Sequence, residues 1–209
     1  MTDLKGRQHD TIAAEHFDKL YAHDNDPWAY QTSPFEAEKR ARTIDALGGR
    51  QFDKGLEIGC SIGILTAQLA PFCASLLGVD SSKAACDLAR QHLSELRNVN
   101  VLQARIPDDL DQLRDLGEYD LIVLSEVLYF FSSSDLTHLS AYVAQSLKAG
   151  GLCVVVNFDG DTQAGFSGLE AAALFSDLTR DSLQVTHCQT YTGFQVMTFE
   201  KRLNASALS

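Results

Sequence analysis

Two segments of the sequence have the residue types needed to hold a nucleoside. Residues 56–63 (LEIGCSIG) run from an apolar stretch into a turn that contains Gly59 and Gly63, with Ser61 between them. A backbone that turns sharply off a strand and approaches a ligand closely favours glycine, because glycine has no Cβ to obstruct either. Asp80 ends a second apolar stretch, 21 residues after Gly59, where a carboxylate accepts hydrogen bonds from both hydroxyls of a ribose. A turn-forming or helix-capping aspartate is the alternative for that residue.

Glu126 is the candidate for acid–base chemistry. It interrupts the apolar run 122–131 (IVLSEVLYFF), and an unpaired carboxylate among apolar side chains costs free energy. Either Glu126 is exposed at a strand end and faces the reacting group of a substrate, or it is a structural carboxylate whose hydrogen bonds are satisfied. Tyr129 follows closely enough to line the same cleft.

The N-terminal part of the chain offers aromatic and cationic side chains. Residues 26–30 (DPWAY) place Trp28 and Tyr30 in a polar loop, where an aromatic face can cover a cation or stack on a sugar. A segment that only packs on the domain is the alternative. Lys39 and Arg40 either reach an anionic group of the ligand or lie on a solvated helix face, and we predict the solvated face. The apolar stripe of that helix is predicted at Ala37, Ala41, Ile44 and Leu47.

The elements that must position these residues alternate along the chain. The sequence predicts helices over 10–23, 34–47, 62–70, 82–96, 107–116, 134–148 and 167–178, with capping boxes at Ser33–Glu36 and Ser167–Glu170 and a glycine stop at Gly150–Gly151. It predicts strands over 55–59, 75–80, 99–104, 119–125, 151–158, 183–191 and 194–200. Alternation of this kind is typical of a mostly parallel α/β sheet, and the last two strands close an antiparallel hairpin across Thr192–Gly193.

Composition narrows the class of protein. A formal net charge of −11 without a basic cluster disfavours nucleic acid as a partner. The five cysteines form no CxxC pair, and the six histidines show no ligand spacing, so we expect reduced thiols and no metal site. The start of the chain has no apolar signal region, and no stretch approaches the roughly 18 apolar residues of a membrane helix. We therefore expect a cytoplasmic protein without membrane insertion.

The order of elements resembles that of class I methyltransferases dependent on S-adenosylmethionine (SAM), in which a terminal hairpin inserts one reversed strand at the edge of the sheet. A nicotinamide oxidoreductase would continue with parallel units instead. Residues 56–63 resemble the first motif of that superfamily, E/D-x-G-x-G-x-G, with Ser61 in place of the middle glycine. Segments 16–21, 26–30 and 33–39, together with 56–61 and 124–130, resemble the nodulation protein S family of methyltransferases, and the likeness extends to about Arg202.

This resemblance implies a Rossmann-like, seven-stranded, mostly parallel sheet with a terminal antiparallel hairpin and an N-terminal helical lid. We place the lid at 1–48, the cofactor-binding domain at 49–202 and a tail at 203–209. Adenine is held after the third strand in this superfamily. Because no carboxylate precedes Asp108 there, we expect backbone groups of Ala104 and Arg105 to recognise the ring. The expected cofactor-binding residues are Trp28, Glu57, Gly59, Cys60, Ser61, Gly63, Asp80, Ser81, Ala104, Arg105 and Ser125.

The resemblance also implies SAM as methyl donor, S-adenosylhomocysteine (SAH) as product, and N-methylation of an amino sugar at the end of a chito-oligosaccharide or of a related small molecule. Glu126 would take the proton of the amine or stabilise its charge, with Tyr30 and Tyr129 contacting the acceptor. A hydroxyl acceptor needs a stronger base, and no histidine dyad is visible. An O-methyltransferase of a small metabolite and a non-catalytic SAM-binding subunit stay open as alternatives. The sequence gives neither the acceptor nor the oligomeric state.

Overall fold

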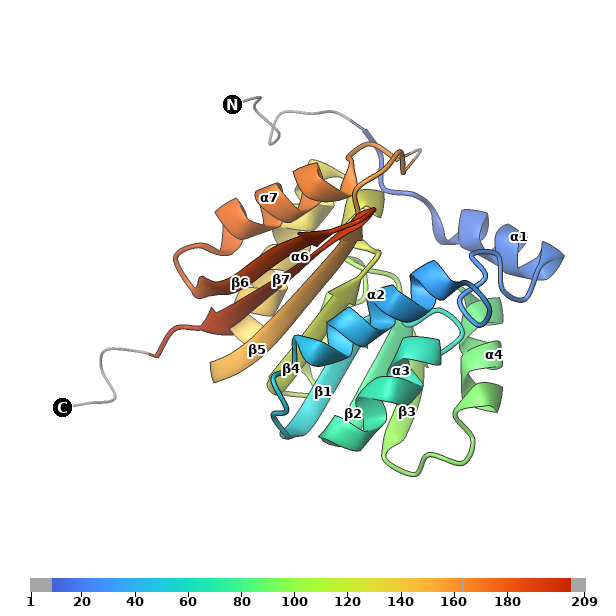
Figure 1. The fold of residues 1–209 in the computed structure, drawn as a ribbon, viewed down its shortest axis with the longest axis horizontal. Helices are drawn as coiled ribbons and strands as arrows, with labels where there is room; N and C mark the ends of the chain where they lie inside the picture. Colours follow the sequence, from blue (N-terminus) through green and yellow to red (C-terminus); the bar gives the residue numbers. More distant parts are fainter. Residues whose placement is uncertain (1–8, 163, 204–209) are drawn as a thin grey trace.

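The sheet holds seven strands in the order β3-β2-β1-β4-β5-β7-β6 (Figure 1). The structure, a computed structural model, describes residues 9–162 and 164–203. Strands β1 to β5 pair in parallel, whereas β7 is antiparallel to both β5 and β6. The predicted fold class, including the terminal hairpin, is confirmed. The strands are β1 Phe52–Ile58, β2 Cys73–Asp80, β3 Val99–Gln103, β4 Tyr119–Ser125, β5 Leu147–Phe158, β6 Leu183–Tyr191 and β7 Phe194–Lys201.

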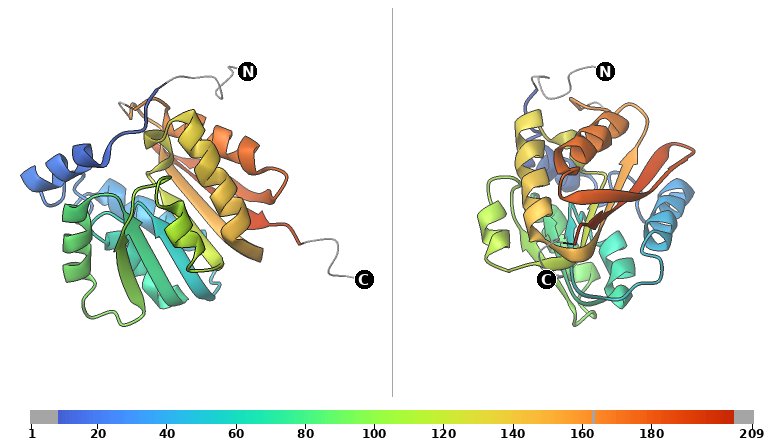
Figure 2. Two further views of the ribbon diagram at one scale, coloured as in Figure 1. Left: turned by 180° about the vertical axis from the view of Figure 1, so that it is seen from behind. Right: turned by 90° about the vertical axis from the view of Figure 1, so that its left-hand side faces the viewer.

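Helices cover both faces of this sheet (Figure 2). Ile122 and Leu124 of β4 pack into one apolar cluster with α5, α6 and α7, while Leu121 and Val123 pack into a second with α3. Burial on both faces explains why 119–125 is a nearly continuous apolar run. The helices are α1 Ala14–His23, α2 Pro34–Asp45, α3 Ile64–Leu69, α4 Lys83–His92, α5 Leu110–Arg114, α6 Ser133–Ser146 and α7 Gly168–Thr179, with short 3₁₀ turns η2 Ala70–Phe72 and η3 Leu128–Phe130.

The two predicted capping boxes differ in outcome. At α7, Ser167 accepts from the Glu170 N–H while the Glu170 carboxylate accepts from the Ser167 N–H, so the box is complete. At α2, Ser33 accepts from the Glu36 N–H at 3.4 Å, but its own N–H donates to the carbonyl of Ala29. The carboxylate of Glu36 is therefore free to turn toward another partner.

The predicted end of α6 at Lys148 is wrong, and so is the glycine stop at Gly150–Gly151. Residues 147–151 belong to β5, because Leu147 pairs with Tyr119 at the start of β4. The next paired residue on β5 is Leu152, opposite Leu121, so the extra residues form an irregularity in the strand, where Gly150 has a φ of +72°. A pair of glycines fits a strand bulge as well as a helix stop.

Other helices are shorter than predicted. α1 begins at Ala14 and not at residue 10, α4 ends at His92, and α5 spans only Leu110–Arg114. The residues before α1 form an extended strap instead. In the strap, the Ile12 N–H donates to the Phe130 carbonyl at 2.9 Å. Parts of the predicted lid (1–8) and tail (204–209) lie outside the described residues.

Candidate functional site

A cavity of about 330 Å³ lies at the carboxyl ends of β1, β2 and β4. Strand-end residues form one side, and α1 with the loop before α2 forms the other, as expected for the crevice of an open parallel sheet. A smaller cavity of about 30 Å³ adjoins it and contacts Glu57 and Cys60. Gly63 lines neither cavity. The predicted residues that line the larger cavity are Trp28, Tyr30, Gly59, Ser61, Asp80, Ser81, Ala104, Arg105, Ser125, Glu126 and Tyr129.

The turn after β1 has the geometry that its glycines predict. Gly59 and Gly63 have a φ of +83°, and the N–H of Gly59 donates to the Val79 carbonyl at 2.7 Å. A Cβ on Gly63 would come within 2.8 Å of the Leu93 side chain at the end of α4, so Gly63 allows the start of α3 to pack closely against α4. Ser61 also has a positive φ, +51°. Its hydroxyl contacts that of Tyr21, which gives this departure from glycine a structural use.

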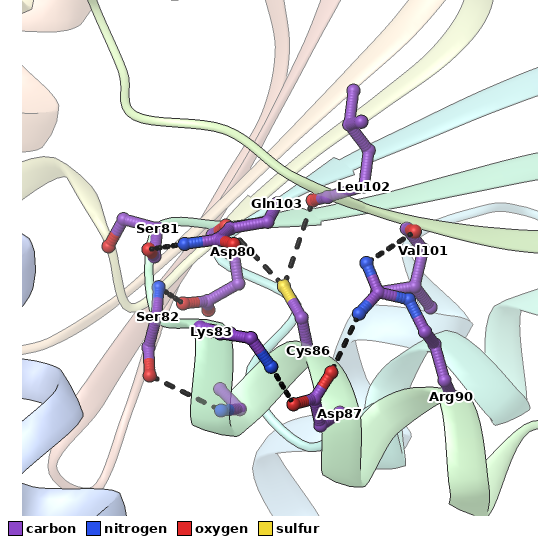
Figure 3. A network of polar contacts seen from close by, with 11 residues as sticks. Asp80, Ser81, Ser82, Lys83, Cys86, Asp87, Arg90, Val101, Leu102 and Gln103 are labelled. Carbon is purple, nitrogen blue, oxygen red and sulfur yellow. Dashed lines mark hydrogen bonds and ion pairs between the residues drawn. The ribbon is translucent and has the colours of Figure 1, made fainter.

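Asp80 joins this turn to the start of α4. Its two carboxylate oxygens accept from the N–H groups of Ser61 and Ser82, each at 2.9 Å, and Figure 3 shows the side chain beside Ser81 and Ser82. Burial raises the pKa of the Asp80 carboxyl, and these N–H donors oppose the shift. Asp80 therefore has the turn-forming role that the sequence left open as an alternative. Since each carboxylate oxygen has a second lone pair and the residue lines the cavity, the ribose role is compatible with it.

At the end of β3, two backbone N–H groups that were expected to be available to adenine already donate hydrogen bonds within the protein. The Ala104 N–H donates to the Asp80 carbonyl at 3.0 Å, and the Arg105 N–H donates to Asp109 at 2.7 Å. The Arg105 guanidinium pairs with Glu15 of α1 at 2.6 Å. Recognition of adenine by Ala104 and Arg105 stays a prediction, now without these two N–H groups as donors. Asp108 also lines the cavity and offers the carboxylate that the third strand itself lacks.

Glu126 lies in a buried cluster of charges that the sequence did not reveal. Its Oε2 accepts from the Tyr129 hydroxyl at 2.7 Å, and its Oε1 lies 3.4 Å from Lys39 Nζ, which also contacts Glu36 Oε1 at 2.8 Å. Burial raises the pKa of Glu126, with Lys39 and Tyr129 opposing and Glu36 reinforcing the shift. Glu126 is thus neither exposed nor fully satisfied, because its Oε1 accepts no hydrogen bond from the described residues.

The prediction of a solvated face for Lys39 and Arg40 is wrong. Their exposed fractions are 4% and 9%. The buried face of α2 consists of Glu36, Lys39, Arg40 and Thr43, which share one side of a helix at spacings of three and four. Ala37 and Ala41 of the predicted apolar stripe are exposed instead, whereas its Ile44 and Leu47 pack into the core. The helical spacing of these four polar residues is visible in the sequence, but a sequence alone does not show that such a face is buried.

Arg40 and Glu57 share the smaller cavity. Arg40 donates from Nη1 to the Tyr30 carbonyl at 2.6 Å, and no carboxylate of the described residues forms an ion pair with it. Burial raises the pKa of Glu57 to about 8, so this side chain is mostly protonated at neutral pH. A buried guanidinium without a carboxylate partner, beside a neutral acid, suits the carboxylate of a ligand.

The loop before α2 places its aromatic rings beside the glycine turn. Asp26 accepts from the N–H groups of Tyr30 and Gln31 at 2.7 and 2.9 Å, which fixes the loop. The Trp28 ring lies between those of Tyr21 and Tyr30, with centroids 5.6 and 5.8 Å away. Because Tyr21 also contacts Ser61, this aromatic group covers the turn from the side opposite the sheet.

Residues 9–162 and 164–203 contain neither a candidate metal site nor a candidate membrane-spanning helix. No group of three or more His, Cys, Asp and Glu side chains could hold a metal ion there. In the same residues, no helix is both long and apolar enough to cross a bilayer.

Known proteins share both the sequence pattern and the fold. The family model described as "Nodulation protein S (NodS)" matches residues 14–151. Nodulation protein S of Sinorhizobium fredii is 33% identical over 106 residues, covering 50% of this chain and 47% of the relative. The protein of the same name from Rhizobium tropici is 29% identical over 143 residues, covering 63% and 58%. This chain thus matches about half the length of these relatives.

A solved structure agrees with the architecture. The crystal structure of N-methyltransferase NodS from Bradyrhizobium japonicum WM9 in complex with SAH superposes with a TM-score of 0.75 at 22% identity, covering 90% of this chain and 97% of that one. At this identity the likeness establishes the fold.

Proposed function

Because this chain belongs to the nodulation protein S family, we propose that it is a SAM-dependent methyltransferase that methylates an amine. One observation carries the proposal: a single cavity joins the turn at Gly59 and Asp80 to the buried carboxylate of Glu126. A nucleoside-binding end and an acid–base group in one cavity are what transfer from a nucleoside cofactor requires. SAM, when bound, supplies a methyl group already activated on a sulfonium.

The chain has groups suited to each part of the cofactor. Asp80 would accept from the ribose hydroxyls, the end of β3 at Ala104 and Arg105 would hold the adenine, and Arg40 would bind the methionine carboxylate. Trp28 would cover the sulfonium region. Because Gly59 has no side chain, the cofactor could approach the backbone closely there. The remaining contacts with the cofactor would come from Glu57, Cys60, Ser61, Ser81 and Ser125.

Transfer to nitrogen is supported over transfer to oxygen. An amine has to lose a proton, and a buried carboxylate with a raised pKa is a competent acceptor for it. Alignment of the acceptor then supplies most of the rate. Among the described residues that line the cavity there is no histidine to activate a hydroxyl. Tyr30 and Tyr129 flank Glu126 and would orient the acceptor.

We propose an amino sugar or a related small amine as the acceptor, including an amino sugar at the end of an oligosaccharide. The net charge of −11 supports a partner other than nucleic acid. The N-terminal segment up to residue 48 would act as a lid over the cofactor domain at 49–202, since α1 and the Trp28 loop line the cavity. Use of SAM and cysteines without CxxC pairing support a cytoplasmic location.

Calorimetry and a methyl-transfer assay test the proposal. We expect SAH to bind and NAD to give no measurable heat, and methyl transfer from SAM to appear on amines of a small-molecule and glycan panel. Absence of SAH binding would refute the cofactor assignment. Tight SAH binding without transfer to any amine or hydroxyl would instead identify a non-catalytic SAM-binding subunit.

A further inference from the structure

The cluster of Glu36, Lys39 and Glu126 carries one negative charge more than its own residues balance. Two carboxylates face one ammonium, and the neighbouring hydroxyls of Tyr30 and Tyr129 are neutral, because burial raises the pKa of both. Glu36 is 8% exposed and Lys39 is 4% exposed. Arg40 lines the smaller cavity together with these residues, but it donates to the Tyr30 carbonyl and forms no ion pair with either carboxylate. A buried excess charge is costly unless something else compensates it.

Two oxygen atoms of this cluster have no hydrogen-bond donor in the described part of the chain. They are Glu36 Oε2 and Glu126 Oε1, both buried, and the second has only the long ion pair with Lys39 at 3.4 Å. All three residues of the cluster line the large cavity, and they also line the smaller cavity that contains Arg40. Buried carboxylate oxygens are almost always satisfied in proteins, so two incompletely satisfied oxygens on residues that line a cavity indicate a ligand that brings N–H groups.

From this geometry we propose that Glu36 and Glu126 form a two-carboxylate subsite that binds the acceptor amine as an ammonium ion, with Lys39 as the fixed counter-charge. The inference rests on the proposed methyl transfer and specifies its substrate class. Once the ammonium is bound, two negative and two positive charges balance. When the ammonium nitrogen passes one proton to Glu126, the amine lone pair is freed and Glu126 becomes a neutral acid. Lys39 still pairs with Glu36, so the buried cluster stays neutral through this proton transfer. The methyl group then brings one positive charge from the sulfonium to the nitrogen, and release of the proton from Glu126 restores the balance.

The place of the cluster in the sheet favours the acceptor over the cofactor as its ligand. Glu126 follows β4 and Asp80 ends β2, and β1 lies between these strands. Two strand spacings separate their ends by roughly 10 Å.

This charge count predicts a definite preference among acceptors. A monocationic amine without a neighbouring carboxylate completes the cluster. An alcohol brings no charge, and a zwitterionic amino acid brings no net charge, so both leave one carboxylate uncompensated. Besides burial, the groups that act on the ionisation of Glu126 are Lys39 and Glu36 from α2 and Tyr129 from η3, and Tyr30 from the preceding loop also interacts with it.

The test uses matched ligands on SAH-saturated protein. Calorimetry compares D-glucosamine with D-glucose, and n-butylamine with n-butanol, each pair exchanging an ammonium for a hydroxyl. For the unmodified protein we expect the amine of at least one pair to bind about 10- to 100-fold more tightly than its alcohol, the factor expected for a charge-assisted hydrogen bond. Equal affinity within both pairs, or no binding of either amine, overturns the proposal. This comparison needs no variant.

Glu36→Gln then identifies the residue responsible, with Glu38→Gln as its control. Glu38 lies on the exposed side of α2 and pairs only with Arg42, at 3.7 Å, among the described residues. We expect Glu36→Gln to abolish the amine preference with unchanged SAH affinity, and Glu38→Gln to retain it. Weaker SAH binding in Glu36→Gln would assign the cluster to the cofactor and overturn the proposal. SAH binding to the unmodified protein, measured first, tests the proposed function separately.

Discussion

Replacing Glu126 with glutamine tests whether this carboxylate acts on the acceptor. The change retains the shape of the side chain and an oxygen for the Tyr129 hydroxyl, but removes the negative charge 3.4 Å from Lys39. If Glu126 takes the proton of the amine, methyl transfer should fall by about 10²–10⁴-fold while SAH affinity stays unchanged. A radiolabelled-SAM transfer assay and SAH calorimetry on one preparation measure both quantities.

The expected effect of this change on stability is smaller. At 3.4 Å and an effective dielectric constant near 20, two unit charges attract by about 5 kcal/mol. Desolvation of the buried carboxylate offsets most of that attraction. We therefore expect the free energy of unfolding to change by no more than about 1–3 kcal/mol. A marked fall in melting temperature, with activity per folded molecule retained, would make Glu126 structural and refute the reasoning.

The pH dependence of transfer gives an independent check. Burial raises the pKa of Glu126 above its ordinary value of 4.5. Only the ionised carboxylate accepts a proton, so transfer should increase as the pH rises through this elevated pKa. The glutamine variant should lack that limb of the profile. An identical limb in both proteins would assign the titration to another group.

Three further changes follow from the same geometry. Asp80→Ala should weaken SAH binding by about 1.5–3 kcal/mol for each bond lost to the ribose; unchanged affinity in calorimetry would contradict the ribose role. Burial raises the pKa of Glu57 to about 8, so the native state binds an extra proton and its stability should fall by a few kcal/mol, in order of magnitude, as the pH rises from about 4.5 to about 8. Urea unfolding at both ends of that range should show a larger loss in the parent protein than in Glu57→Gln, in which Asp80 and Glu126 still titrate with raised pKa values; equal losses would contradict it. Deletion of the residues before Pro34 should leave a folded core without transfer activity, and full activity of the truncated protein would exclude a catalytic lid.

The sequence by itself determined the architecture and the nucleoside end of the site. Strand 119–125 was predicted with its observed bounds, because a strand covered on both faces has to be apolar throughout. The turn at Gly59 and the position of Asp80 followed from local conformational needs, which a few neighbouring residues fix. The terminal hairpin followed from two strands joined by a short glycine turn. Each of these features depends on residues close together in the chain.

Only the tertiary structure decided what α2 contributes. Periodicity and the N-cap at Ser33 located the helix, but burial of its apolar stripe was correct only for Ile44 and Leu47 and not for Ala37 and Ala41. Lys39 is paired with Glu126 from the turn after β4, and Arg40 donates to the Tyr30 carbonyl of the preceding loop. Glu36 is paired with Lys39 of the same helix. A buried charge is tolerated only when the fold supplies a counter-charge or a hydrogen bond. Since Lys39 and Glu126 meet only through the packing of α2 beside the end of β4, no local pattern in the sequence indicates that pair.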